Sequence, residues 1–213
     1  EKDISYDLSE KCGQKKARNF ERATEILEQK TILNFYKSVN QQIRVSCTNI
    51  SPPSDKEGHF VAGEGGPDTI INATNYAVIL NGTIALYRPE SCEAPQIAIH
   101  ELLHALGFNH NNNSNSIMFP YTNCEQVIDK EILDEINRLY SPPSLPDLAI
   151  ELIIANKSGT YLNLNIVITN LGLKESKSSA LIKKTNRKTF DRIPIEEIDL
   201  GGKRLLAIQN LRI

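Results

Sequence analysis

Residues 100–110 read His100-Glu101-Leu102-Leu103-His104-Ala105-Leu106-Gly107-Phe108-Asn109-His110 and place three histidines and a glutamate within eleven positions. On a helix, His100 and His104 are separated by about 6 Å along one face, so both imidazoles can reach one metal ion. Gly107 can adopt a left-handed conformation that ends the helix and returns His110 to the same ion. Three neutral imidazoles with one open coordination position are typical of a catalytic zinc site.

Glu101 lies beside the first histidine and is not needed as a ligand. A carboxylate at this position can act on a water at the open position, which predicts a general base. The motif uses three of the four histidines in the chain, and we interpret the fourth, His59 in a glycine-rich loop, as a solvated residue. We therefore predict one catalytic Zn²⁺ held by His100, His104 and His110, with Glu101 as the catalytic residue.

The segment after the zinc motif, Ser116-Ile117-Met118-Phe119-Pro120-Tyr121, contains the only methionine of the chain. The zinc motif followed by this turn resembles the metzincin metallopeptidases, with Met118 at the Met-turn. Within the metzincins, residues 3–140 are most similar to the matrixins. The resemblance implies an α+β fold: a twisted mixed sheet, an active-site helix and a C-terminal helix. Met118 would form an apolar floor under the metal, and Tyr121 is a candidate contact to the substrate or the transition state.

The periodicity of the chain before residue 141 alternates between helices and strands. Strands are expected over 4–8 and 43–47, and helices over 17–33, 94–106 and 125–140, where Val127 joins the apolar stripe. Asn81-Gly82 predicts a hairpin turn between strands 76–80 and 83–87. The glycine-rich residues 58–66 are expected to form a loop. By resemblance, the hairpin is the edge of the sheet, and a substrate would lie extended beside residues 83–87.

Three prolines within Ser141-Pro142-Pro143-Ser144-Leu145-Pro146 predict a stiff linker between a domain at 1–141 and another at 142–213. The second part changes to strands, expected over 148–154, 162–169, 180–184 and 205–208. Its segments resemble the CARDB-type immunoglobulin-like modules of bacterial and archaeal surface proteins. The resemblance implies an all-β sandwich, incomplete at Ile213, that acts as a spacer or a binding unit and could attach the protein to a cell surface.

Four cysteines, Cys12, Cys47, Cys92 and Cys124, lie at no zinc-finger spacing, so disulfides and an oxidising compartment are expected. The matrixin resemblance implies the pairs Cys12–Cys47 and Cys92–Cys124. Residues 1–141 carry 13 Lys and Arg against 19 Asp and Glu, whereas 142–213 carry 11 against 7. The basic excess of the second part is too small and too dispersed for nucleic-acid binding. No apolar run approaches the roughly 20 residues of a membrane-spanning helix.

These features together predict a secreted or surface-attached zinc endopeptidase that acts on a protein or peptide substrate. The main alternative is a surface adhesion or binding protein with a catalytically inactive zinc site. A structural zinc site has no use for the base Glu101, which favours the enzyme. A third hypothesis is a zinc peptidase of another clan, in which His110 is not a ligand.

Overall fold

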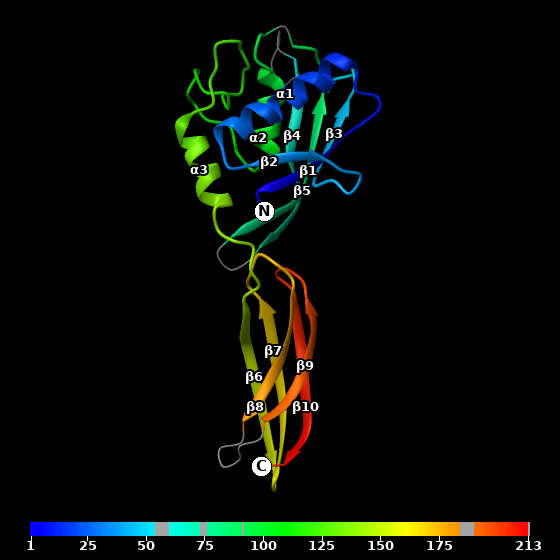
Figure 1. Cartoon of the computed structure of the whole chain (residues 1–213), viewed down its shortest axis with the longest axis vertical. Helices are drawn as coiled ribbons and strands as arrows, with labels where there is room; N and C mark the ends of the chain where they lie inside the picture. The colour runs from blue at the N-terminus through cyan, green and yellow to red at the C-terminus, as the bar shows by residue number, and fades with distance from the viewer. Residues whose placement is uncertain (54–59, 73–75, 91, 184–189, 213) are drawn as a thin grey trace. The chain divides into compact units, whose positions relative to one another are not determined.

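The computed structural model describes residues 1–53, 60–72, 76–90, 92–183 and 190–212. His59, which we interpreted as a solvated loop residue, lies outside the described residues. The chain groups into two compact units, one formed by residues 1–70 and 79–142 and the other by residues 71–78 and 143–213. The first unit contains the helices, and the long strands β6 to β10 lie in the second (Figure 1).

A five-stranded sheet in the order β2-β1-β3-β5-β4 forms the frame of the first unit, except that the last residues of β4 and the first residues of β5 group with the second unit. Its strands are β1 (Asp3–Leu8), β2 (Asn34–Lys37), β3 (Ile43–Cys47), β4 (Gly63–Asn72) and β5 (Ala77–Leu86). β1 pairs in parallel with β2 and β3, and β3 pairs in parallel with β5. Only residues 73–76 connect β4 to β5, too few for a parallel crossover, so β4 runs antiparallel at the edge. The sheet is therefore mixed, as the sequence predicted.

Helices α1 (Gln14–Lys30) and α2 (Gln96–Ala105) contact each other, which places them on the same face of the sheet (Figure 1). α1 begins and ends about one turn earlier than the sequence predicted. Its apolar stripe is fully buried at Phe20 and Leu27. α2 has nearly all its side chains buried, including Leu102 and Leu103 at 0 % exposure, and its apolar residues share one core cluster with residues of α1 and the sheet. The core of the unit therefore lies around the zinc-motif helix.

The predicted hairpin turn at Asn81-Gly82 is wrong, because β5 runs through both residues as one strand. Gly82 pairs with Ile43 of β3 in this strand and does not have a positive φ. A Cβ at Gly82 would lie 3.2 Å from the Cβ of Ala105, so the glycine permits a close approach to α2 rather than a turn. The predicted loop is also wrong at its end, since residues 63–66 begin β4.

Helix α3 (Lys130–Tyr140) begins five residues later than predicted. Val127, which we placed on its apolar stripe, is 60 % exposed. Its backbone instead bridges the Met-turn, because Ile117 N donates to Val127 O at 2.8 Å and Val127 N donates to Asn115 O at 3.0 Å. This segment therefore supports the turn below the histidines, and the helix begins only after Asp129.

Two disulfides connect the elements of the first unit, Cys12–Cys47 and Cys92–Cys124. These are the pairs that the matrixin resemblance implied. The first links the residues before α1 to β3, and the second links the segment before α2 to the chain after the Met-turn. In the described part of the chain, no helix is long and apolar enough to span a membrane.

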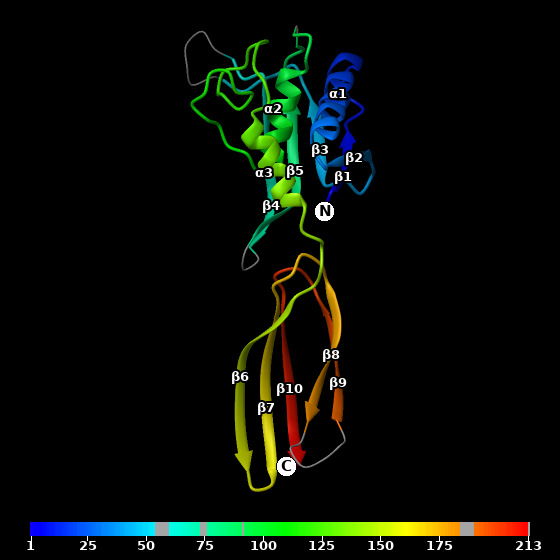
Figure 2. The same ribbon diagram turned by 60° about the vertical axis from the view of Figure 1, so that its left-hand side comes forward.

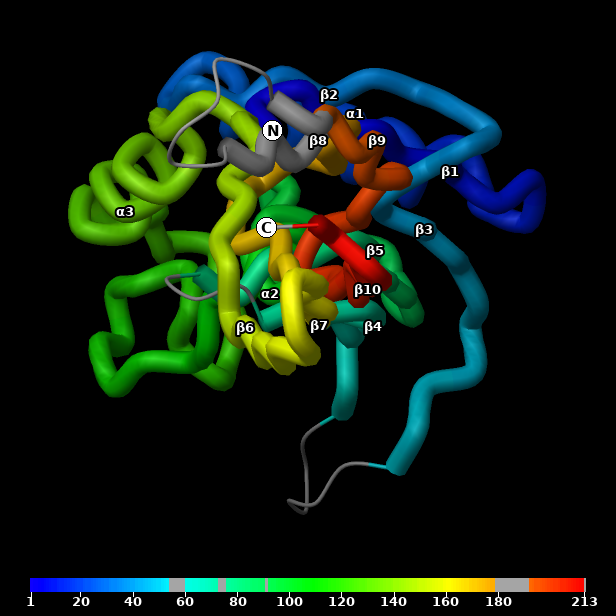
Figure 3. The backbone as a smooth tube through the Cα atoms, turned by 90° about the horizontal axis from the view of Figure 1, so that it is seen from below, coloured from blue at the N-terminus to red at the C-terminus, as the bar shows by residue number. Residues whose placement is uncertain are grey.

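The second unit has two antiparallel sheets, β10-β7-β6 and β8-β9. The strands are β6 (Leu148–Ser158), β7 (Tyr161–Asn170), β8 (Ser176–Lys183), β9 (Phe190–Ile198) and β10 (Lys203–Arg212). Figures 2 and 3 show β6, β7 and β10 side by side, with β9 across from them. Isoleucines from β7, β9 and β10 form a shared core, so the two sheets pack face to face.

The sequence missed strand β9, because Pro194 interrupts its pattern and a proline argues against a central strand. β9 pairs only with β8 in the described residues, which leaves an edge where proline is tolerated. The predicted strands 148–154, 162–169 and 205–208 are shorter than the observed strands β6, β7 and β10. The predicted strand 180–184 falls on β8, and its last residue, Lys184, lies outside the described residues. Asn170 is fully buried; its side chain accepts a hydrogen bond from Asp147 N and donates to Lys174 O and Ile198 O. It therefore joins the start of β6, the connection between β7 and β8, and the end of β9.

Edge strand β4 lies unusually close to α2, where glycines face the helix. A Cβ at Gly65 would lie 2.2 Å from the backbone oxygen of Glu101, a distance that no side chain can occupy. A Cβ at the neighbouring Gly66 would meet nothing within 4 Å. The close contact between strand and helix therefore requires glycine at one position and not at the next.

We expect Gly65→Ala to lower the free energy of unfolding by about 1–3 kcal/mol, because the strand must move away from α2. Gly66→Ala is the matched control and should change it by less than about 0.5 kcal/mol. Urea denaturation of the two variants and the parent chain measures the difference. Equal stability of the two variants would contradict the close approach of β4 to α2.

Candidate active site

The end of helix α2 turns the chain back toward its own histidines. Gly107 adopts φ 97°, the left-handed conformation that the sequence predicted for it. Phe108 N donates to Leu103 O at 3.0 Å, the bond that closes a helix ending in a left-handed residue. His110 follows this turn, so its side chain returns to the face of α2 that carries His100 and His104.

The structure brings the three predicted histidines together at their Nε2 atoms. The Nε2–Nε2 distances are 3.0 Å between His100 and His104, and 3.1 Å from His110 to each of the others. His100 is buried, His104 is half-buried and His110 is exposed, so the cluster opens to solvent on one side. In the described residues, this is the one cluster of three or more metal-ligating side chains.

The Nδ1 atoms of His100 and His104, which face away from the centre of the cluster, lie close to backbone carbonyl oxygens. His100 Nδ1 lies 2.6 Å from Ile117 O, and His104 Nδ1 lies 2.7 Å from Phe108 O. A carbonyl only accepts hydrogen bonds, so each Nδ1 carries the proton and each Nε2 presents a lone pair to the centre. Burial lowers the pKa of His100 to about 4 and also lowers the pKa of His104, which favours neutral rings.

This arrangement fits a zinc ion. Converging lone pairs repel one another at these distances unless a cation lies among them. A tetrahedral zinc with bonds of about 2.0–2.1 Å separates its nitrogen ligands by roughly 3.3 Å, close to the observed spacing. Neutral imidazoles oriented through Nδ1 by backbone carbonyls are the usual ligand set for this metal.

Glu101 is 6 % exposed and lines the same cleft as the histidines, a cavity of about 1340 Å³. Its side chain packs under β4, where a Cβ at Gly63 would lie 2.7 Å from Glu101 Cγ. Burial and, to a lesser extent, the nearby Glu64 carboxylate together raise the pKa of Glu101 to about 8. The carboxyl group of Glu101 is thus buried beside the histidines on the same cleft.

The Met-turn is connected to Asn111, the residue after the third histidine, by a partly buried polar network. Met118 and Ser116 are both 0 % exposed. Ser116 Oγ accepts from Met118 N at 3.0 Å and from Asn111 Nδ2 at 2.7 Å, and it donates to the Asp129 carboxylate at the start of α3. Asn111 directly follows His110, and its amide reaches the turn. The network fixes the loop that carries His110.

Tyr121, which we predicted to contact the substrate or the transition state, lines the cleft and is 38 % exposed. Its ring lies edge-on to Phe119, with the ring centroids 5.8 Å apart. It therefore belongs to the wall that the chain forms after the Met-turn, on the same cavity as the histidines.

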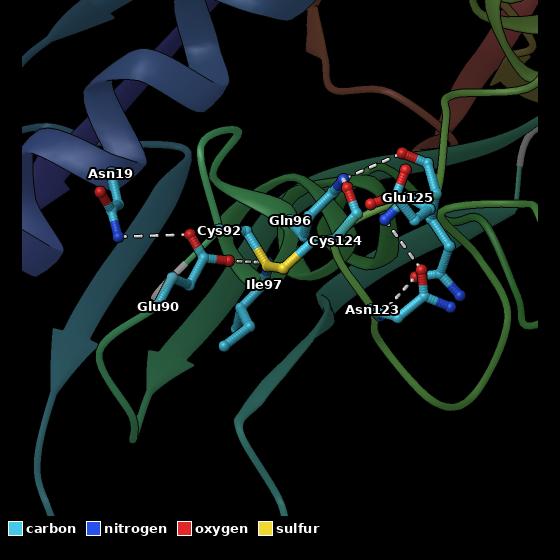
Figure 4. Close-up of a disulfide and its surroundings, with 9 residues drawn as sticks. Asn19, Glu90, Cys92, Gln96, Ile97, Asn123, Cys124 and Glu125 are labelled. Carbon is cyan, nitrogen blue, oxygen red and sulfur yellow. Dashed lines mark hydrogen bonds between the residues drawn. A yellow bond between two sulfur atoms is a disulfide. The ribbon is translucent and has the colours of Figure 1, made fainter.

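Glu90 is a buried carboxyl group that sequence analysis missed. Its carboxylate accepts from Ile97 N in the first turn of α2, and Asn19 Nδ2 of α1 donates to it at 3.2 Å (Figure 4). α2 begins after Pro95, which provides no side-chain cap, so Glu90 replaces the cap from outside the helix. Gln96 donates to Cys124 O at 3.1 Å and Gln126 O at 2.9 Å, beside the Cys92–Cys124 disulfide. These contacts hold the N-terminal end of the histidine helix.

Burial raises the pKa of Glu90 to about 7, against the opposing effect of the Ile97 and Ala98 amides and of Lys15. A raised folded-state pKa means that the stabilisation is complete below the ordinary value of 4.5 and is lost as the pH rises through 7. We expect Glu90→Gln, which keeps a capping oxygen without the charge, to be more stable than the parent by up to about 3 kcal/mol at pH 7.5. The gain should vanish near pH 4.

Urea denaturation between pH 4 and 8 tests this expectation, with the exposed Glu125→Gln as the control for loss of one negative charge. A Glu90→Gln gain that does not depend on pH would show that Glu90 is not protonated in the fold.

No curated protein matches the chain. Among solved structures, it is similar to high choriolytic enzyme 1, a hatching enzyme zinc-protease from the medaka fish Oryzias latipes, with 24 % identity and a TM-score of 0.32. That match covers 51 % of this chain and 44 % of the hatching enzyme, so the chain spans less than half of that structure. The family model described as matrixin matches residues 1–141, which include every element of the histidine site. The chain therefore belongs to the matrixin family.

Proposed function

We propose that the chain is a zinc-dependent endopeptidase. The observation that carries the proposal is the convergence of three Nε2 atoms within 3.1 Å at the wall of a cleft that also contains a buried carboxyl group. Membership of the matrixin family supports the same reaction class. A purely structural metal site has no need for Glu101 or for an open cleft.

His100, His104 and His110 would hold the zinc ion, with Met118 in the apolar layer of the turn behind them. When bound, zinc polarises the scissile carbonyl and lowers the pKa of a water molecule toward neutrality. Glu101 accepts the proton of the attacking water and passes it to the leaving amine. Tyr121 is proposed to contact the substrate or the transition state from the opposite wall. The reaction needs no covalent intermediate.

The order of the strands corrects our expectation of where a peptide substrate would lie. We expected an extended peptide beside residues 83–87, but β5 is internal, between β3 and β4. The edge strand of the described sheet is β4, and its Gly63 and Gly65 lie against Glu101. We propose that the peptide adds to β4, because the edge strand of a sheet can pair with an extended peptide. In this proposal, the scissile bond would lie beside the buried carboxyl group of Glu101.

The two disulfides support an extracellular location, since cytosolic proteins rarely keep such bonds. We propose that the domain boundary lies near residue 141 and that residues 142–213 form an immunoglobulin-like module that spaces or attaches the peptidase at a cell surface. The two sheets with a shared isoleucine core support this assignment. Bacterial and archaeal surface proteins are the proposed setting.

We expect the zinc-loaded chain to cleave unfolded casein and Glu101→Gln to reduce the rate by about 10²–10⁴-fold, because general acid–base catalysis contributes that much. Electrophoresis and mass spectrometry of the products measure cleavage, with a chelator as the metal control and Glu125→Gln as the charge control. If the zinc-loaded chain cleaves nothing, or if Glu101→Gln cleaves equally well, the inactive-site adhesion hypothesis is favoured instead.

We expect His110→Ala to weaken zinc binding by at least about 10–100-fold, because an exposed third ligand is lost while the fold is kept. Competition with a chromogenic chelator measures the affinity without any reference to activity. His59→Ala, at the one histidine outside the motif, is the matched control. An unchanged affinity in His110→Ala would support a peptidase of another clan with only two of these histidine ligands.

A further inference from the structure

The cleft contains one Lys or Arg side chain among its described lining residues, and this is Arg88. Arg88 follows the end of β5 and is exposed. Its guanidinium carbon lies 4.1 Å from the centroid of the Phe60 ring, which is itself 58 % exposed on the same cleft. Such a cation–π contact orients the guanidinium, and the N–H donors at its edge stay available to a ligand.

The backbone at Arg88 is also held in place. Tyr87 N and Arg88 N both donate to Ala62 O, at 3.0 and 3.1 Å, immediately before β4 begins. Ala62 directly precedes Gly63, which contacts Glu101. A strand advances about 3.3 Å per residue, so Arg88 lies within a few peptide residues of the bond that Glu101 would act on.

No carboxylate of the described residues forms an ion pair with Arg88. The carboxylates that line the cleft already have other contacts: Glu64 accepts from Tyr87 Oη at 2.6 Å, Glu90 caps α2, and Glu101 is buried beside the histidines. An arginine that is oriented by an aromatic ring and has no carboxylate partner among the described residues is suited to bind a carboxylate through two parallel hydrogen bonds.

We propose that Arg88, oriented by Phe60, forms a carboxylate-binding subsite, so that the cleft selects peptides with Asp or Glu within a few residues of the cleaved bond. The proposal rests on the proposed peptidase function and names its substrate class. The carboxylate is that of a side chain, because an endopeptidase substrate continues through the cleft. A free C-terminal carboxylate has the same chemistry, and the test separates the two sources.

The test uses peptides with acetylated and amidated ends, built around one casein cleavage site, with Glu, Gln or Lys placed in turn at each of three positions on both sides. We expect kcat/KM of the zinc-loaded chain to favour Glu over Lys by about tenfold or more at one of these positions, as a charge-assisted pair allows. Arg88→Gln should remove the preference, and Arg88→Glu should reverse it in favour of Lys. Arg44→Gln, at an exposed arginine of β3 outside the cleft, should keep it.

A binding measurement makes the subsite testable without turnover. Fluorescence anisotropy of the zinc-loaded Glu101→Gln chain with labelled Glu and Lys peptides should show the same preference, and Arg88→Glu in that background should reverse it. A preference restricted to peptides with a free C-terminus would identify the terminal carboxylate as the ligand and overturn the side-chain proposal. Equal binding of both peptides, or a preference that survives Arg88→Gln, also overturns it, even if casein cleavage establishes the peptidase.

Discussion

The convergence of three imidazole nitrogens is the constraint on which the rest of the first unit depends. The Nε2 atoms are only 3.0–3.1 Å apart, and their lone pairs repel one another. The fold must therefore hold the three rings in place until a cation neutralises the repulsion. The carbonyls of Ile117 and Phe108 provide part of this restraint, because each fixes one ring through its Nδ1 proton. The Met-turn and the end of α2 are therefore parts of the metal site through their backbones.

The surrounding contacts hold α2 at its ends and along its length. Glu90 and the Cys92–Cys124 disulfide restrain its N-terminal end, whereas the left-handed Gly107 defines its C-terminal end. Between the two ends, β4 reaches the backbone of Glu101, because Gly65 has no side chain. Each restraint comes from a different part of the chain, so the helix position depends on the whole unit. A small displacement of any one of these restraints would move α2, and with it His100, His104 and Glu101.

The cleft combines features of opposite character. One part is a buried carboxyl group under a glycine-lined strand, where burial raises the pKa of Glu101. The other part is the exposed Arg88, which follows β5 and lies on the ring of Phe60 shortly before β4 begins. The first suits proton transfer, and the second suits recognition of a charged substrate. Both depend on β4, which is why the edge strand, rather than the internal strand β5, is central to the proposed function.

Local spacing was enough to predict the histidine cluster, because the three histidines and Gly107 all lie within residues 100–110 and follow from helical spacing and one glycine. The sequence by itself also determined the strand at 43–47 and the change to β-structure after the linker, since these depend on local periodicity. Only the tertiary structure decided that Gly82 lies within a strand, that Val127 bridges the Met-turn, and that Glu90 caps α2. The physical reason is distance along the chain. A glycine needed for close approach looks the same in sequence as one needed for a turn, and a cap or a cation–π pair formed between separate segments leaves no local pattern.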